Sequence, residues 1–211
     1  VLVTAGGTQE NIDPVRYIGN RSSGKMGYAI AEQAVRMGAN VILVSAPTSL
    51  SVPSGVEFVP VDSALSMQEA VESRYKNVDV VVMAAAVSDF RVLHKAEQKI
   101  KKMESMTLEL VKNPDILQGL GSHKEHQILV GFAAETEHVI KYGQDKVARK
   151  NLDMLVANDV SKSNAGFNID TNEGYFLYPD KDPKEMANMK KSELAQYIMK
   201  EVVELVANKH P

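Results

Sequence analysis

The chain of 211 residues contains no cysteine. This absence excludes disulfides, zinc sites built from thiolates and cysteine nucleophiles, and it suits a cytoplasmic protein. The five histidines, at positions 94, 123, 126, 138 and 210, include no His-x-x-x-His pair. Such a pair would place two imidazoles on one helical face, so we expect no metal site held by protein ligands.

Long apolar runs and an excess of positive charge are also missing. No stretch approaches the length needed to span a bilayer, and no signal-peptide pattern is present, so we expect no membrane association. Lysine and arginine total 24 against 27 aspartates and glutamates, for a net charge of -3. Because this balance gives no broad basic field, we expect no nucleic-acid partner. Any phosphate-bearing ligand must be held by a local group of residues.

What the sequence does contain is an alternation of short apolar runs with helical patterns. This alternation, at 44% hydrophobic residues, predicts a single α/β domain over 1–211 with a Rossmann-like, mostly parallel sheet flanked by helices. Strands are expected at 1–5, 40–45, 56–61, 78–84, 107–111, 127–133, 154–157 and 175–178. Helices are expected at 28–37, 64–75, from Pro114, at 137–150 and from about Glu193.

Two segments fall outside this alternation, and the start of the chain is also informative. Residues 161–184 are rich in turn residues and predict a hairpin or arm. The segment 91–102 is rich in lysine and is either a mobile lid or a plain solvated loop. The chain begins on Val1, inside a predicted strand and without an initiator methionine. It is therefore expected to be part of a longer polypeptide.

The segment 13–27 is the most informative part of the chain. It places three glycines, two serines and three cations between a predicted strand and a predicted helix. Backbone N–H groups at a helix N-terminus favour phosphate oxygens, so the segment predicts an anion cradle, with a purely structural turn as the alternative. A P-loop is disfavoured because Met26 stands where Ser or Thr would bind Mg²⁺, and the glycine spacing does not fit a dinucleotide fingerprint either.

Further candidate residues follow at other predicted strand ends and helix faces. Asp89 comes after the small residues Ala84, Ala85 and Ala86, just beyond a predicted strand, where ligands of open α/β sheets bind. It could accept hydrogen bonds from a substrate, or it could cap a helix. The residues 99–102 read as a solvated charge run. Lys146 and Lys150 share one helical face, and taken alone they read as structural.

Several of these motifs, in this order, resemble one family over nearly the whole chain. The chain is similar to the bacterial phosphopantothenoylcysteine synthetases, which are usually fused behind a flavin-dependent decarboxylase. The matching segments are Thr4-Ala5-Gly6-Gly7-Thr8, 13–27, 85–91, Lys99-Ile100-Lys101-Lys102, 111–116, Gly131-Phe132-Ala133-Ala134-Glu135-Thr136, 146–151 and Ala157-Asn158-Asp159-Val160.

The resemblance implies a ligase of coenzyme A biosynthesis. Such an enzyme joins 4′-phosphopantothenate to L-cysteine, uses CTP with Mg²⁺ carried by the triphosphate, and forms an acyl-cytidylate before CMP is displaced. The family fold is Rossmann-like and its members are homodimers. Two rivals stay open: an ATP-using ligase or kinase on the same fold, and a non-catalytic nucleotide-binding domain with regulatory or assembly functions.

The resemblance also implies roles for individual residues. Lys99 would be the catalytic lysine at the α-phosphate, Asn20 would orient the activated acyl group, and Arg16 would bind phosphopantothenate at a site shared across the dimer. Asp89, Ala85 and Ala86 would meet the acyl substrate. The nucleotide would be bound by Ser22, Gly24, Gly27, Met83, Ala84, Ala85, Asp89, Lys99, Pro114, Asp115, Ile116, Leu117, Phe132, Lys146 and Lys150. Gly7 and Gln9 depart from the family pattern of Pro and Arg, so no role is implied for that turn.

Overall fold

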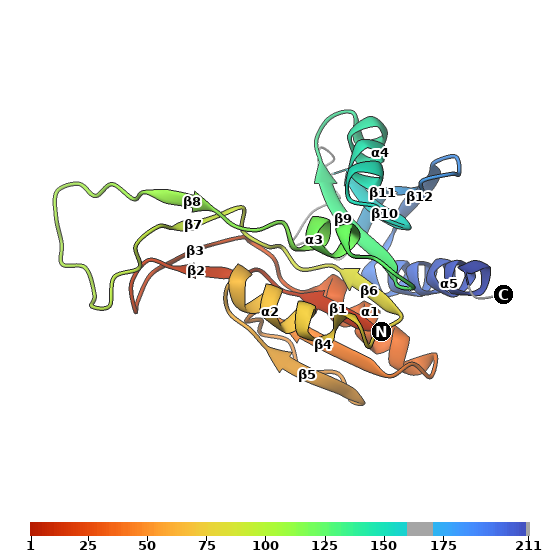
Figure 1. Ribbon diagram of the computed structural model, residues 1–211, viewed down its shortest axis with the longest axis horizontal. Helices are drawn as coiled ribbons and strands as arrows, with labels where there is room; N and C mark the ends of the chain where they lie inside the picture. Colours follow the sequence, from red (N-terminus) through yellow and green to blue (C-terminus); the bar gives the residue numbers. More distant parts are fainter. Residues whose placement is uncertain (160–170, 210–211) are drawn as a thin grey trace.

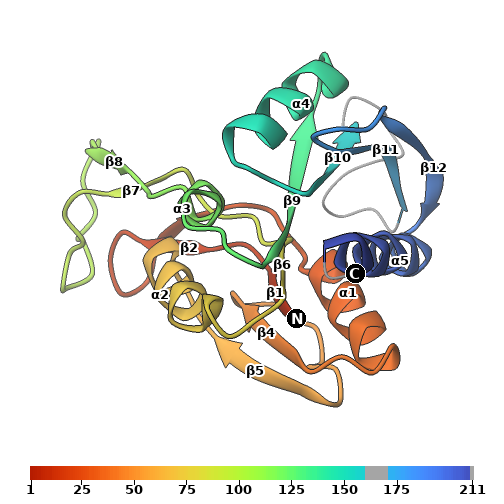
Figure 2. The same cartoon turned by 45° about the vertical axis from the view of Figure 1, so that its right-hand side comes forward.

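In the computed structural model, which describes residues 1–159 and 171–209, eight strands form one central sheet (Figures 1 and 2). Their order is β12-β11-β10-β9-β6-β1-β4-β5, and all neighbours from β10 to β5 are parallel. The parallel strands are β1 (Leu2–Ala5), β4 (Val41–Ser45), β5 (Val56–Pro60), β6 (Val80–Met83), β9 (Ile128–Glu135) and β10 (Met154–Asp159). The predicted Rossmann-like, mostly parallel sheet is confirmed.

Helices cover both faces of the sheet because strand side chains alternate between the faces. On one face, Val3 and strand residues such as Val82 and Val130 pack against α1 (Lys25–Arg36) and α5 (Lys191–Lys209) in one core cluster. On the opposite face, Leu2 and strand residues such as Val81 and Leu129 pack against α2 (Ala64–Tyr75), α3 (Ile116–Ser122) and α4 (Val139–Arg149) in a second core cluster. A sheet buried on both faces explains why its strands read as continuous apolar runs in the sequence.

Two antiparallel ribbons form an arm that extends away from the sheet (Figure 1). One ribbon pairs β2 (Gln9–Asn11) with β3 (Tyr17–Gly19), and the other pairs β7 (Phe90–Val92) with β8 (Leu110–Lys112). The prediction of one ligand loop over 13–27 was wrong in its first part, because residues 13–19 belong to the turn and second strand of a ribbon. The strand expected at 107–111 corresponds in part to β8, but it pairs with β7 in the arm and, contrary to expectation, is not part of the main sheet. The other three strands of the arm were not predicted, because strands of three residues are too short to show an alternating pattern.

The C-terminal region adds two antiparallel strands, β11 (Thr171–Leu177) and β12 (Lys184–Lys190), to the edge of the sheet. The predicted arm at 161–184 lies partly outside the described residues, and its described part is this strand pair within the main sheet. A buried carboxylate joins the pair to α5: Glu201 accepts hydrogen bonds from the Tyr178 hydroxyl, at 2.6 Å, and from the Lys184 ammonium. None of the helices in the described part of the chain is long and apolar enough to cross a membrane.

Candidate functional site

A cavity of about 570 Å³ lies beyond the carboxyl ends of the central strands. Strand order reverses between β1 and β6, since the chain continues from β1 to β4 on one side and later returns to β6 on the other. Open α/β sheets bind ligands at this point, because loops from adjacent strands diverge there and leave a crevice. The volume lies within the range of small-molecule sites. Topology alone therefore makes this cavity the candidate site.

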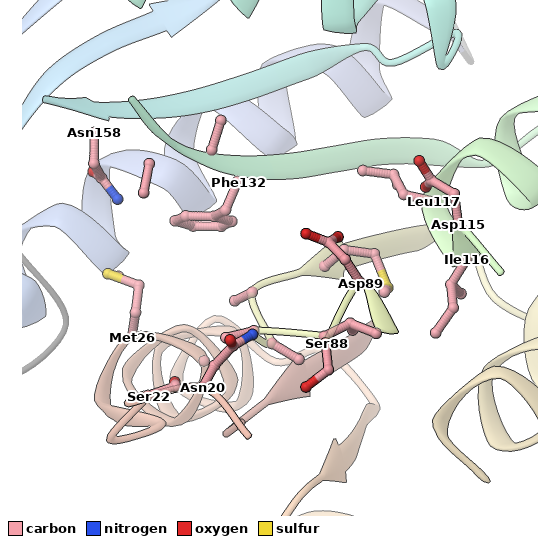
Figure 3. Close-up of a pocket in the computed structure, with 18 of the residues that line it drawn as sticks. Asn20, Ser22, Met26, Ser88, Asp89, Asp115, Ile116, Leu117, Phe132 and Asn158 are labelled. Atoms are coloured by element: carbon pink, nitrogen blue, oxygen red, sulfur yellow. The ribbon is translucent and has the colours of Figure 1, made fainter. Parts of the chain in front are cut away.

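The N-terminus of α1 forms one wall of the cavity, with Asn20 and Ser22 beside it (Figure 3). Gly24 precedes the helix with φ of 77° in the left-handed region, and a Cβ there would lie 2.6 Å from the Thr48 methyl carbon. The N-cap residue Gly24 has no side chain to cap this helix start, and the hydrogen bond that Ser23 Oγ accepts from the Lys25 N–H is long, at 3.5 Å. Its N–H groups and its dipole thus favour an anionic ligand, as the sequence predicted for this part of the segment.

Gly27 lies within α1, three residues beyond Gly24, although the sequence predicted a helix that starts only at Tyr28. A Cβ on Gly27 would lie 2.6 Å from the Ala5 Cβ and 2.7 Å from the Thr4 carbonyl oxygen. The glycine thus allows the first turn of the helix to pack against β1. This packing requirement explains Gly27 without a ligand, even though the residue also lines the cavity.

Asp89 projects into the cavity from the opposite side, between Phe132 and the start of α3 (Figure 3). It follows the segment Met83-Ala84-Ala85-Ala86, which lines the cavity at the end of β6. Phe132 comes from β9 and presents its ring to the same space. A carboxylate beside an aromatic ring and small residues suits a ligand with hydroxyl groups and a planar ring.

Positive charge predominates around the cavity. The described lining residues include six basic side chains and two acidic ones, which are Lys25, Lys112, Lys146, Arg149, Lys150 and Lys191 against Asp89 and Asp115. A cleft lined by one sign of charge attracts ligands of the opposite sign. The chain as a whole is weakly acidic, so the basic character is a local property of this site.

The two lysines named from the sequence each contact a carboxylate. Lys146 Nζ lies 2.5 Å from Glu135 Oε1, and Lys150 Nζ lies 2.9 Å from Asp115 Oδ2. Asp115 also caps α3 by accepting from the Gln118 N–H at 3.0 Å. Burial alone would raise the pKa of Asp115, but the hydrogen bonds from Lys150 and Gln118 hold that pKa below its usual value. Both lysines are thus held in place at the cavity rim.

Sequence reasoning missed several lining residues on the far side of the cavity, namely Met26, Asn158, Asn172 and Lys191. Asn158 and Met26 lie within family-like segments but were given no role, and Asn172 and Lys191 lie in no motif. Met26, Asn172 and Lys191 come from α1, β11 and the first residue of α5, and only the three-dimensional packing of these elements brings them together. Asn158 lies opposite Asp89 in the cavity (Figure 3).

Arg16 and Lys99 are not among the described residues that line the cavity. Both belong to the arm, whose tip is formed by the chain between β7 and β8 (Figure 1). Buried Asp13 holds this region together, since its carboxylate accepts from the Arg16 guanidinium at 2.7 Å and from the Ile100 N–H at 3.1 Å. The other predicted site residues, Asn20, Ser22, Gly24, Gly27, Met83 to Ala86, Asp89, Pro114 to Leu117, Phe132, Lys146 and Lys150, all line the cavity.

Comparison with known proteins gives consistent matches over nearly the whole chain. The chain is 49% identical over 207 residues to the coenzyme A biosynthesis bifunctional protein CoaBC of Bacillus subtilis (strain 168), covering 97% of this chain and 51% of that protein. It is 46% identical over 208 residues to CoaBC of Escherichia coli (strain K12), covering 96% of this chain and 51% of that protein. The chain therefore spans about half the length of these curated relatives.

A solved structure agrees with the sequence matches. The crystal structure of the C-terminal domain of a coenzyme A biosynthesis bifunctional protein CoaBC superposes with a TM-score of 0.84 at 44% identity, covering 98% of this chain and 96% of that one. Residues 1–206 match the family described as the DNA/pantothenate metabolism flavoprotein C-terminal domain. The chain belongs to this family.

Proposed function

We propose that the chain is the synthetase part of a bifunctional enzyme and joins 4′-phosphopantothenate to L-cysteine at the expense of CTP. The observation that carries the proposal is the cavity at the switch point, where a helix start with glycine at its N-cap, a surplus of basic side chains and Asp89 face one another. These features suit a nucleoside triphosphate, and family membership supports the ligase reaction over other uses of that nucleotide.

In the proposed first half-reaction, a carboxylate oxygen of phosphopantothenate attacks the α-phosphorus of CTP. The bond from that phosphorus to the bridging oxygen breaks, and pyrophosphate leaves. Negative charge grows on the phosphate oxygens in the transition state, so fixed cations and N–H donors are the groups that accelerate this step. The start of α1, with Ser22, and Lys146 and Lys150 would hold the triphosphate, while Lys99 would neutralise charge at the α-phosphate.

In the proposed second half-reaction, the cysteine amine attacks the acyl carbon and loses a proton. The bond from that carbon to the cytidylate oxygen breaks, and CMP leaves. Asn20 would hydrogen-bond to the acyl group and orient it for attack, with Asp89 and the backbone of Ala85 and Ala86 beside it. Phe132 and the segment Pro114 to Leu117 would hold the base and ribose.

Mg²⁺ fits this site as a cation carried by the triphosphate. Two carboxylates line the described part of the cavity, and no group of three His, Cys, Asp or Glu side chains among the described residues could form a metal cage. Mg²⁺ commonly takes most of its ligands from substrate phosphates and water, so it would need no dedicated set of protein ligands here. The bound cation would offset charge on the phosphate oxygens.

A homodimer would explain why Arg16 and Lys99 lie on the arm. The arm carries several strongly exposed apolar side chains, including Val15, Tyr17 and Met103, which are 61%, 53% and 65% exposed. Exposed apolar patches of this kind mark interaction surfaces. The arm of a second copy would cover this surface and bring Arg16 and Lys99 to a shared site. We further propose a fused decarboxylase part in the full-length protein and a cytoplasmic location.

The test is pyrophosphate release measured with CTP or ATP, with and without phosphopantothenate and cysteine. The proposal requires release that depends on phosphopantothenate, prefers CTP, and turns over continuously only when cysteine is present. Preference for ATP would favour the rival ligase or kinase. Folded protein that binds nucleotide without any release would be a binding domain.

A further inference from the structure

Three segments of the chain meet at the side chain of Asn113, which is only 5% exposed. The residue lies between β8 and the segment Pro114 to Leu117 that lines the cavity. Its side chain reaches across to residues 88–91, which connect the end of β6 to β7. Asn113 thus lies where β7 and β8 both leave the cavity.

Three hydrogen bonds of this residue join these segments, two from its side chain and one from its backbone. The side-chain Nδ2 donates to the Ser88 carbonyl oxygen at 2.8 Å, and Oδ1 accepts from Arg91 Nη1 at 3.0 Å. The backbone N–H of Asn113 donates to the Asp89 carbonyl oxygen at 2.8 Å. An amide is the side-chain group that can donate and accept in this way, so Asp or Leu of similar size could not replace all of these bonds.

These bonds fix the direction in which Asp89 points. The carbonyl of Ser88 and the carbonyl of Asp89 are both held by Asn113, and the Ser88 N–H is held by Thr8 Oγ1 at 2.9 Å. With the peptide groups on both sides of Asp89 immobilised, its Cα–Cβ bond has one orientation, toward the cavity (Figure 3). Asp89 is itself exposed, and its carboxylate has no hydrogen bond or ion pair with the residues that the structure describes.

We infer that Asn113 is the positioning residue of the site: it aims Asp89 at the ligand and fixes the distance between Asp89 and the segment Pro114 to Leu117. Asn113 also lines the cavity, but it is almost fully buried and its amide is bonded to Ser88 and Arg91, so it acts through these neighbours rather than by binding the reacting groups. The inference rests on the proposed function insofar as it takes the ligand to be a nucleotide.

The experiment measures CTP binding by calorimetry and kcat/KM for CTP by pyrophosphate release. The variants are Asn113→Ala, Asn113→Asp, Asp89→Asn and the double variant Asn113→Ala with Asp89→Asn. The matched control is Gln127→Ala, which removes another buried amide. Gln127 is 1% exposed, donates to the Tyr75 carbonyl at 3.2 Å and accepts from the Glu125 N–H at 3.0 Å, at the opposite end of the sheet.

We expect Asn113→Ala to weaken CTP binding about tenfold and to lower kcat/KM about a hundredfold, since small displacements of a site group cost this much. Asn113→Asp should behave alike, because it loses the donor to Ser88. In the Asp89→Asn background the additional loss should be less than about twofold, as expected for residues that act as one unit. Gln127→Ala should lower the unfolding temperature comparably and leave CTP affinity unchanged.

Three results would overturn the inference: wild-type affinity in Asn113→Ala, an equal loss of affinity in Gln127→Ala, or fully additive effects with Asp89→Asn. Failure of the proposed function gives a different result. If the wild-type protein binds CTP but releases no pyrophosphate, the ligase proposal fails, while the affinities of the variants still decide the role of Asn113.

Discussion

The two ends of the central sheet are built from the same kinds of polar residues but use them differently. At the amino end, Asp153 accepts from the Leu129 N–H at 2.7 Å and from Lys124 Nζ at 3.2 Å. Lys209 Nζ donates to the Gln127 carbonyl at 2.7 Å, next to the same aspartate. These charges bind one another and the backbone, and they join α5 and β9 to the loop before β10.

At the carboxyl end, buried polar residues such as Asn113 hold backbone segments in a similar way, but the segments surround a cavity. Basic side chains outnumber acidic ones there by six to two among the described lining residues. The comparison teaches that hydrogen bonding of buried polar groups is a requirement of folding at both ends, whereas a surplus of one charge around a cavity is the feature that indicates a ligand. Substitutions at the two ends should therefore separate activity from stability.

The largest effect is expected for Lys99→Gln on the arm that leaves the carboxyl end. Losing this cation should slow cytidylate formation roughly a thousandfold, because it removes charge stabilisation from the transition state. Single-turnover pyrophosphate release checks this. Lys95→Gln removes an exposed cation from the same loop and serves as the control. Equal rates in Lys99→Gln and the control would remove Lys99 from the catalytic machinery.

Asn20→Asp should slow the second half-reaction about a hundredfold while the first continues. The carboxylate keeps the size of the side chain but loses the amide donor that would orient the acyl group. Rapid quenching and mass spectrometry should then detect accumulated acyl-cytidylate, which wild-type enzyme with cysteine consumes. A variant that neither accumulates the intermediate nor loses turnover would contradict the role of Asn20.

Mixing these two inactive variants tests the shared site. If Lys99 and Asn20 of one site come from different copies, a mixed dimer holds one site with both residues intact, and activity should return to about a quarter of the wild-type value after random exchange. Persistently inactive mixtures with demonstrated subunit exchange would place both residues of a site on the same chain.

Much of this site could be predicted from residues that follow strands. The order of strands and helices predicted the sheet, and the position of Asp89 after its strand placed it at the carboxyl end, whereas Phe132 was identified only through the family resemblance. The arm could not be predicted in the same way. Its strands have three residues each, and the contact of Asp13 with Ile100 joins positions 87 residues apart. Nothing local in the sequence signals such a pairing.

The cavity residues that sequence reasoning missed also depend on contacts between distant parts of the chain. Asn172 and Lys191 reach the cavity only because β11 turns back beside β10 and α5 starts directly after β12. Gly27 was predicted as a ligand loop residue, whereas its closest constraint is the contact between α1 and β1. A glycine near a phosphate cradle can serve packing, and the sequence alone does not separate the two roles.

A smaller effect should distinguish the two ends of the sheet directly. Lys150→Gln at the carboxyl end should weaken CTP binding about tenfold, the value of one lost hydrogen bond to a charged group. Lys124→Gln at the amino end should instead lower the free energy of unfolding by roughly 1–3 kcal/mol, with CTP affinity unchanged. Calorimetry and urea unfolding of both variants provide the check. The distinction between the ends fails if the two variants lose CTP affinity alike.

The smallest expected effect is that of Glu201 on the pH dependence of stability. Burial tends to raise the pKa of this carboxyl, but the hydrogen bonds from Lys184 and Tyr178 hold it below its usual value. A depressed pKa in the folded state gives stability that is complete above the unfolded value, about 4.3, and is lost as pH falls through the folded value. Glu201→Gln should therefore lose less stability than wild type between about pH 5 and about pH 3 in urea titrations. Equal slopes would show that this carboxyl does not contribute to acid unfolding.

A crystal structure of the protein with CTP is the most direct test of the central claim that the cavity at the carboxyl end binds the nucleotide. The account predicts the triphosphate at the start of α1 within reach of Lys146 and Lys150, and the base and ribose beside Phe132 and Asp89. Nucleotide bound at any other place, with this cavity holding only solvent at saturating CTP, would contradict it.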